Sequence, residues 1–73
     1  MELKILRIRA RMNQAEAAEK VGVTQAALCD WENGKYRPKP ASVAKLAEVY
    51  GVSEAKILKA VEEAAKEAKM IGD

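Results

Sequence analysis

Residues 13–34 have the sequence NQAEAAEKVGVTQAALCDWENG, and this stretch decides the fold. Asn13 and Thr24 are residue types that favour helix N-caps, and Glu16 follows Asn13 at the spacing of a capping box. Gly22 suits the left-handed C-cap that ends many helices. The stretch therefore predicts one helix from about residue 13 to 21 and a second from about 24 to 33, joined by a very short turn.

Two short helices joined so tightly must cross steeply, and this geometry restricts the residues that fit. Ala18 has to be small where the two backbones approach, and Gly22 has to adopt a positive φ, which glycine does freely. The positions that hold the pair on the rest of the core are all apolar, namely Val21, Val23, Leu28 and Trp31. A second helix held in this way can present its first turn to the major groove of DNA. A purely structural helical hairpin is the alternative interpretation.

The rest of the chain also has helical spacing and no alternating pattern typical of strands. We expect a first helix from Glu2 to about Ala10, a fourth from about Ala41 to Gly51, and a fifth that follows Ser53 without a helix breaker until Gly72. The fold class expected is all-α, a compact five-helix domain whose last helix is extended. Residues 1–73 would form one domain, with the helix-turn-helix at about 13–33 and a possible dimerisation helix at about 53–71.

The composition excludes several classes of site. Histidine is absent and cysteine occurs once, at Cys29, so neither an intramolecular disulfide nor a zinc cluster can form. Ser and Thr have no evident base beside them, so we expect no enzyme activity, no metal and no cofactor. We find no signal peptide and no apolar run of membrane-spanning length, and we expect a cytoplasmic protein.

The net charge of +2 is small, but its distribution is uneven. Residues 1–40 contain eight Lys and Arg against five Asp and Glu, which gives +3, whereas residues 41–73 contain five against six, which gives −1. A basic amino-terminal half fits contact with phosphate, although ordinary scatter of surface charge would give the same numbers.

Three pieces of the sequence resemble a known family: Asn13-Gln14, Gly22-Val23-Thr24-Gln25 and Glu32-Asn33-Gly34. Together they are similar to the phage repressor and Cro family, also called the xenobiotic-response-element family, over about residues 3–58. The resemblance implies a five-helix domain of the lambda-repressor-like kind that binds double-stranded operator DNA as a homodimer, usually as a repressor. No small-molecule ligand is implied.

The same resemblance assigns roles to individual residues. It implies that Gln25 contacts a base, and a Gln side chain can bind adenine with two hydrogen bonds. The positions expected to face bases are Gln25, Ala26, Ala27 and Asp30. The positions expected to contact phosphate are Asn13, Gln14, Thr24, Asn33, Lys35, Tyr36 and Arg37. Arg7 and Glu32 match a salt bridge that ties the first helix to the end of the third.

Two residues depart from the family pattern. Asp30 can accept a hydrogen bond from cytosine, or it can point at Lys35 or Arg37 and contact no base. Arg11 replaces a glycine that is common at that helix end, so it either introduces a small backbone strain or shifts the end of the helix.

The dimer interface is expected near the junction of the fourth and fifth helices, at Val52, Ile57, Leu58 and Val61. Beyond that junction, a stripe of residues recurs at three- and four-residue spacing, as in a short coiled coil, at Leu58, Val61, Ala65 and Ala68. The alternative is that Leu58 and Val61 merely complete the core of the monomer.

Two other functions remain open on the sequence. A module that binds only partner proteins would explain Asp30 and the two alanines on the expected contact surface. An antitoxin that represses its own operon is a variant within the DNA-binding class. A redox role for Cys29 lacks a second cysteine to resolve an oxidised thiol.

Overall fold

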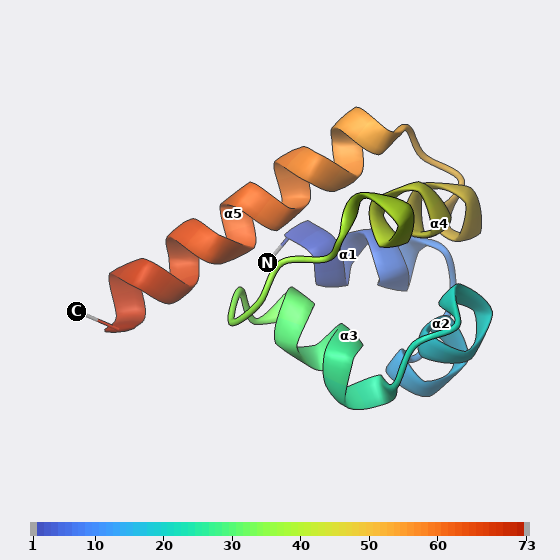
Figure 1. The fold of residues 1–73 in the computed structure, drawn as a ribbon, viewed down its shortest axis with the longest axis horizontal. Helices are drawn as coiled ribbons and strands as arrows, with labels where there is room; N and C mark the ends of the chain where they lie inside the picture. The colour runs from blue at the N-terminus through green and yellow to red at the C-terminus, as the bar shows by residue number, and fades with distance from the viewer. Residues whose placement is uncertain (1, 73) are drawn as a thin grey trace.

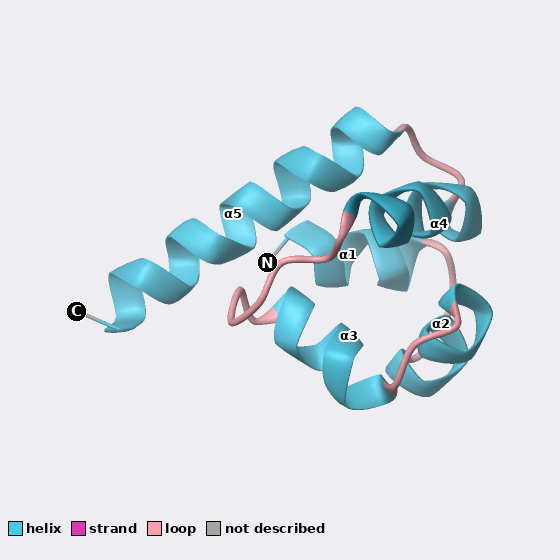
Figure 2. Ribbon diagram, in the orientation of Figure 1, coloured by secondary structure: helices cyan, strands magenta, loops and turns pink. Residues whose placement is uncertain are grey.

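The computed structural model describes the backbone of residues 2–72 and the side chains of residues 2–67. It has five helices, α1 (Glu2–Arg9), α2 (Gln14–Val21), α3 (Gln25–Glu32), α4 (Pro40–Tyr50) and α5 (Glu54–Gly72), and no strand within the described part of the chain. Helices α1 to α4 form a compact group, and the long α5 lies diagonally along one side of it (Figure 1). Short loops make all the connections (Figure 2). The all-α prediction is confirmed.

The ends of α2 and α3 are fixed by the predicted residues. Asn13 Oδ1 accepts a hydrogen bond from the Glu16 N–H at 2.8 Å, and the Asn13 N–H donates to Glu16 Oε1 at 3.1 Å, which completes a capping box. Gly22 ends α2 with a φ of +86°, and its N–H donates to the Ala18 carbonyl at 2.8 Å. Thr24 Oγ1 accepts from the Ala27 N–H at 3.1 Å and starts α3. The turn between the two helices is therefore encoded locally.

The other helix ends differ only slightly from those expected. Helix α4 begins at Pro40, one residue before the expected Ala41, because the fixed φ of proline suits the first position of a helix. Ser53 Oγ accepts from the Lys56 N–H at 3.2 Å at the start of α5. Helix α1 ends at Arg9, and Arg11 has a φ of +62°, the one non-glycine residue in the described chain with a positive φ. The sequence left open whether Arg11 is strained or shifts the end of the helix, and its positive φ shows a strained backbone.

The core contains many small residues. Its largest fully buried side chains are Leu3, Leu28, Leu46 and Ile57. Trp31 is also buried, as its spacing predicts, and Val23 and Val52 pack against the core from the two turns. The alanines buried among the described residues are Ala17, Ala18, Ala47, Ala60 and Ala64. Small side chains let the helices approach closely, and the Ala18 position beside Gly22 follows this rule.

The buried face of α5 differs from the stripe expected from the sequence. Ile57, Ala60, Val61 and Ala64 are all at most 5% exposed, and the recurrence of buried positions at three and four residues defines the face that packs on the domain. Leu58 lies off this face and is 53% exposed. The stripe expected from the sequence, Leu58, Val61, Ala65 and Ala68, is therefore wrong as one face of α5 that is free to pair with another helix, because Val61 belongs to the core. The side chain of Ala68 lies outside the described residues.

Candidate nucleic-acid interface

The first turn of α3 offers a small exposed surface. Gln25 and Ala26 are exposed, whereas Ala27 and Asp30 are half-buried. Ala27 packs against the core, so it has less surface to offer than the resemblance implies. Gln25 is therefore the one long polar side chain exposed on this turn.

Gln25 is connected to the interior by a series of hydrogen bonds. Gln25 Nε2 donates to Gln14 Oε1 at 3.4 Å, and Gln14 Nε2 donates to Glu32 Oε1 at 3.1 Å. Glu32 in turn accepts from Arg7. This relay, defined here as Arg7, Glu32, Gln14 and Gln25, links α1, the start of α2 and both ends of α3. Neither the Gln14–Glu32 nor the Gln14–Gln25 contact was expected from the sequence.

The ion pair at the inner end of the relay is buried. Arg7 Nε donates to Glu32 Oε2 at 2.7 Å and a second guanidinium nitrogen donates to Oε1 at 3.3 Å, while Arg7 also donates to the Met12 carbonyl at 3.0 Å. The two residues are 8% and 2% exposed. The hydrogen bond to Glu32 raises the pKa of Arg7 above its ordinary value despite burial. The pair therefore joins α1 to the end of α3, the arrangement that the resemblance implies.

Tyr50 lies close enough to this pair to be affected by its charges. Burial, followed by the negative charge of Glu32, raises the pKa of Tyr50 to about 12, and the charge of Arg7 opposes this. The Tyr50 hydroxyl is buried and has no hydrogen-bond partner among the described residues. The centre of the domain beneath the relay is thus a buried environment that disfavours an added negative charge.

The polar residues expected to contact phosphate surround the start of α2 and both ends of α3. The side chains of Asn13 and Thr24 are already used as N-caps, although both residues are exposed. Asn33 is exposed at the end of α3, where its Nδ2 donates to Cys29 Sγ at 3.3 Å. Thr24 thus lies at the start of α3, Asn13 at the start of α2, and Asn33 at the opposite end of α3.

The loop after α3, residues 33–39 and called the basic loop below, carries three exposed basic side chains, Lys35, Arg37 and Lys39. Lys35 Nζ lies 5.9 Å from the centre of the Tyr36 ring, and Tyr36 is 60% exposed. Arg37 forms an ion pair with Glu62 of α5, and both side chains remain more than half exposed. Asp30 forms no ion pair within the described residues, so the interpretation that it pairs with Lys35 or Arg37 has no support in the structure.

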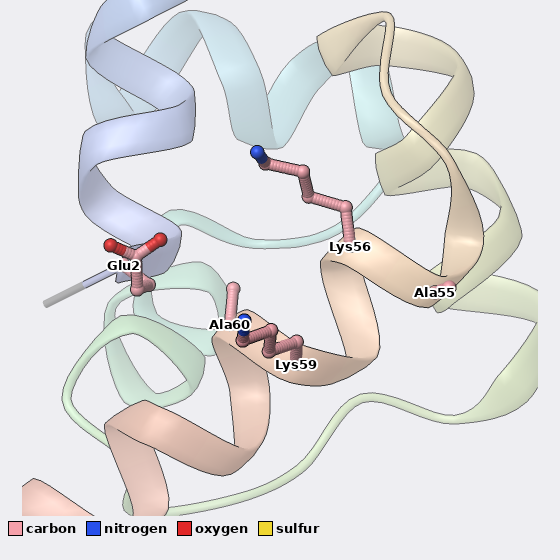
Figure 3. A pocket seen from close by; sticks show the side chains of 5 residues that line it. All are labelled: Glu2, Ala55, Lys56, Lys59 and Ala60. Carbon is pink, nitrogen blue, oxygen red and sulfur yellow. The ribbon is translucent and has the colours of Figure 1, made fainter.

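Two concave surfaces lie outside this set of residues. A pocket of about 430 Å³ separates the start of α1 from the first turns of α5, and Figure 3 shows Glu2 on one side and Lys56 and Lys59 on the other. None of the expected DNA-contacting residues lines it. A second, more apolar groove is lined by Pro38, Pro40, Val43, Glu54 and Leu58. It is bordered by the basic loop and by the exposed Leu58.

Within the described residues, no three Cys, Asp or Glu side chains are grouped so that they could hold a metal ion. No helix in the same part of the chain is long and apolar enough to cross a membrane.

A family model described as "Helix-turn-helix", of the Cro and C1 repressor type, matches residues 3–57. The chain belongs to this helix-turn-helix family. Members of the family are DNA-binding transcription regulators and are generally not enzymes, and the match supports a DNA-binding regulatory role for this chain at the level of the family. No solved structure matches the chain significantly.

Proposed function

We propose that this chain is a sequence-specific transcriptional repressor that binds a palindromic operator as a homodimer, with α3 in the major groove. One observation supports it above the others. Gln25 extends from the exposed first turn of α3 and is held by Gln14 at the start of α2. A helix N-terminus has unpaired N–H groups that suit a phosphate, and a Gln side chain suits an adenine edge. Gln14 would thus contact the DNA backbone while the neighbouring Gln25 contacts a base.

The base contact is tested with Gln25→Ala. We expect the free energy of binding to the best operator, selected from a random duplex library, to weaken by about 1–3 kcal/mol, with relaxed preference at one base pair. Binding to unrelated duplex DNA should hardly change. Equal weakening on operator and unrelated DNA would reject Gln25 as the base contact, and failure of the native chain to bind any duplex would instead favour a protein-interaction module.

The phosphate contact of the loop is tested with Arg37→Ala. Because phosphate contacts release counterions irrespective of sequence, affinity for all duplexes should fall and the salt slope should decrease by about one. Lys45→Ala is the matched control, since Lys45 is an exposed cation on α4 that already has an acidic neighbour, Glu48. An unchanged slope for Arg37→Ala would remove that residue from the interface.

The dimer is proposed through the groove lined by Pro38, Pro40, Val43, Glu54 and Leu58. The partner would be the same surface of a second copy of the chain. This surface adjoins the basic loop, so pairing there would set two α3 helices one helical turn of DNA apart, about 34 Å. Of the interface residues expected from the sequence, Leu58 is exposed and Val52 half-buried, whereas Ile57 and Val61 lie in the core and can contribute only from beneath.

Sedimentation of the operator complex tests the pairing. Leu58→Gln should abolish cooperative binding of two chains to a palindrome, while Ile8→Gln should not, because Ile8 is exposed to a similar extent on α1 (55% against 53%) and does not line the groove. One native chain per palindromic site would reject the dimer.

A further inference from the structure

The second half of α5 lies directly against the loop that follows α3. Gly34 has a φ of +73°, and a Cβ added there would lie 2.2 Å from the carbonyl oxygen of Ala64. Ala64 itself is fully buried. The loop backbone therefore lies against the α5 backbone at this point, with no room for a side chain at residue 34.

This docking places an acidic residue of α5 beside the loop's arginine. Glu62 lies two residues before Ala64 and forms an ion pair with Arg37, three residues after Gly34. The contact joins residues 25 apart in sequence and belongs to no helix end or local turn. Lys35, the other cation near the start of the loop, lies by the Tyr36 ring instead and forms no ion pair with the α5 side chains that the structure describes, those up to residue 67.

We propose that in the DNA-free protein the Glu62 carboxylate binds the Arg37 guanidinium, which in the complex binds a DNA phosphate instead. Glu62 thereby limits the affinity of the domain for all DNA sequences. The inference rests on the proposed function in one respect, namely that Arg37 contacts phosphate. A carboxylate and a phosphate both accept charge-assisted hydrogen bonds from a guanidinium, so the two compete for the same donors. Glu62 is then a positioning residue that acts on DNA only through Arg37.

The size of the effect follows from the exposure of the pair. The side chains of Arg37 and Glu62 are 58% and 54% exposed, and exposed ion pairs are weak and screened by salt. Competition of this strength corresponds to about a two- to fivefold change in the dissociation constant at low salt. Such a contact adjusts affinity without preventing DNA binding.

The test measures binding of a duplex of random sequence by Glu62→Gln in three backgrounds: the native chain, Arg37→Ala and Lys35→Ala. We expect Glu62→Gln to tighten binding about two- to fivefold in the native and Lys35→Ala backgrounds, and to have almost no effect in Arg37→Ala. Glu63→Gln, which removes the same charge from the next residue of α5, measures the general effect of a less acidic helix. Far-ultraviolet circular dichroism and thermal unfolding of each variant verify that the fold is retained.

The outcomes separate this inference from the proposed function. If Arg37→Ala alone leaves affinity and salt slope unchanged, the phosphate contact is wrong and the inference falls with it. If Arg37→Ala weakens binding, the inference alone is overturned by any of three results. These are weaker or unchanged binding by Glu62→Gln, an equal gain in the Arg37→Ala background, and a gain no larger than that of Glu63→Gln.

Discussion

The molecule contains two Arg–Glu pairs, each joining residues 25 apart in sequence, in very different surroundings. Arg7 and Glu32 lie at the junction of α1 and α3, where both side chains are at most 9% exposed. Arg37 and Glu62 lie at the junction of the basic loop and α5, where both are more than half exposed. The same chemistry thus occurs once inside the domain and once on its surface.

The comparison shows how burial decides what an ion pair can do. Inside the domain, loss of one partner leaves an uncompensated charge in a buried environment, so the two side chains have to remain paired. On the surface, water solvates either partner at little cost, so the pair can open when a phosphate competes. We therefore expect the buried pair to hold α1 on α3, and the exposed pair to adjust DNA affinity in the way that we propose for it.

The largest effect expected is that of Glu32→Ala. The change leaves Arg7 buried without its carboxylate and removes a partner of Gln14, so the free energy of unfolding should fall by about 3–5 kcal/mol in urea titrations. The double variant Arg7→Met/Glu32→Leu removes both charges and should recover most of the loss. A double variant no more stable than Glu32→Ala would contradict the role given to the unpaired charge.

The docking of the loop on α5 should give the next largest effect. Gly34→Ala and Gly51→Ala both force an alanine into a left-handed conformation, which costs about 1–2 kcal/mol, but at Gly51 nothing lies within 4 Å of the added Cβ. We therefore expect Gly34→Ala to cost about 1–3 kcal/mol more than Gly51→Ala, because the added methyl meets the α5 backbone. Equal losses in thermal unfolding would show that α5 does not press on the loop.

Tyr50 tests how strongly the buried surroundings of the first junction disfavour a negative charge. Because its pKa is raised to about 12 from an ordinary value of 10, Tyr50 favours folding in its neutral form; this stabilisation is complete below pH 10 and is lost as the pH rises from 10 to 12. In the native chain the free energy of unfolding should decrease by an amount on the order of 2 kcal/mol between pH 10 and pH 12. In Tyr50→Phe this decrease should be absent. At neutral pH the variant should be as stable as the native chain, since the hydroxyl has no partner. Identical alkaline profiles would contradict the buried environment.

The smallest effect expected on stability is that of Glu62→Gln. The exposed pair should change the free energy of unfolding by less than about 0.5 kcal/mol, even though the same variant is expected to alter DNA affinity. A loss of 2 kcal/mol or more in urea titrations would mean that the surface pair is structural after all, and the contrast between the two junctions would disappear.

The helices could be predicted because their ends are decided by neighbouring residues. Asn13, Gly22, Thr24 and Gly51 each act within one turn of the chain, and each has the expected conformation or cap. The core positions of the first four helices follow from the same spacing. The contact between Arg7 and Glu32 came from the resemblance to a family, since nothing local connects the two residues.

What the sequence did not reveal depends on the position of α5. Successive residues of a helix are about 100° apart around its axis, and spacing alone did not distinguish the face with Ile57 and Ala64 from the neighbouring one with Leu58. The contact of Gly34 with Ala64 and the pair of Arg37 with Glu62 follow from the same placement. The hydrogen bonds of Gln14 were missed because a polar residue at a helix start has many possible partners.

The relay that ends at Gln25 has a consequence for the entropy of binding. A free Gln side chain loses up to about 1.5–2 kcal/mol of rotamer freedom when it is fixed in one conformation. The hydrogen bonds from Gln25 to Gln14 and from Gln14 to Glu32 restrict that freedom while the domain folds. Under the base contact that we propose for Gln25, part of its ordering cost is met before DNA binds. Loss of Arg7 is then expected to increase the disorder of this glutamine, 18 residues away in sequence.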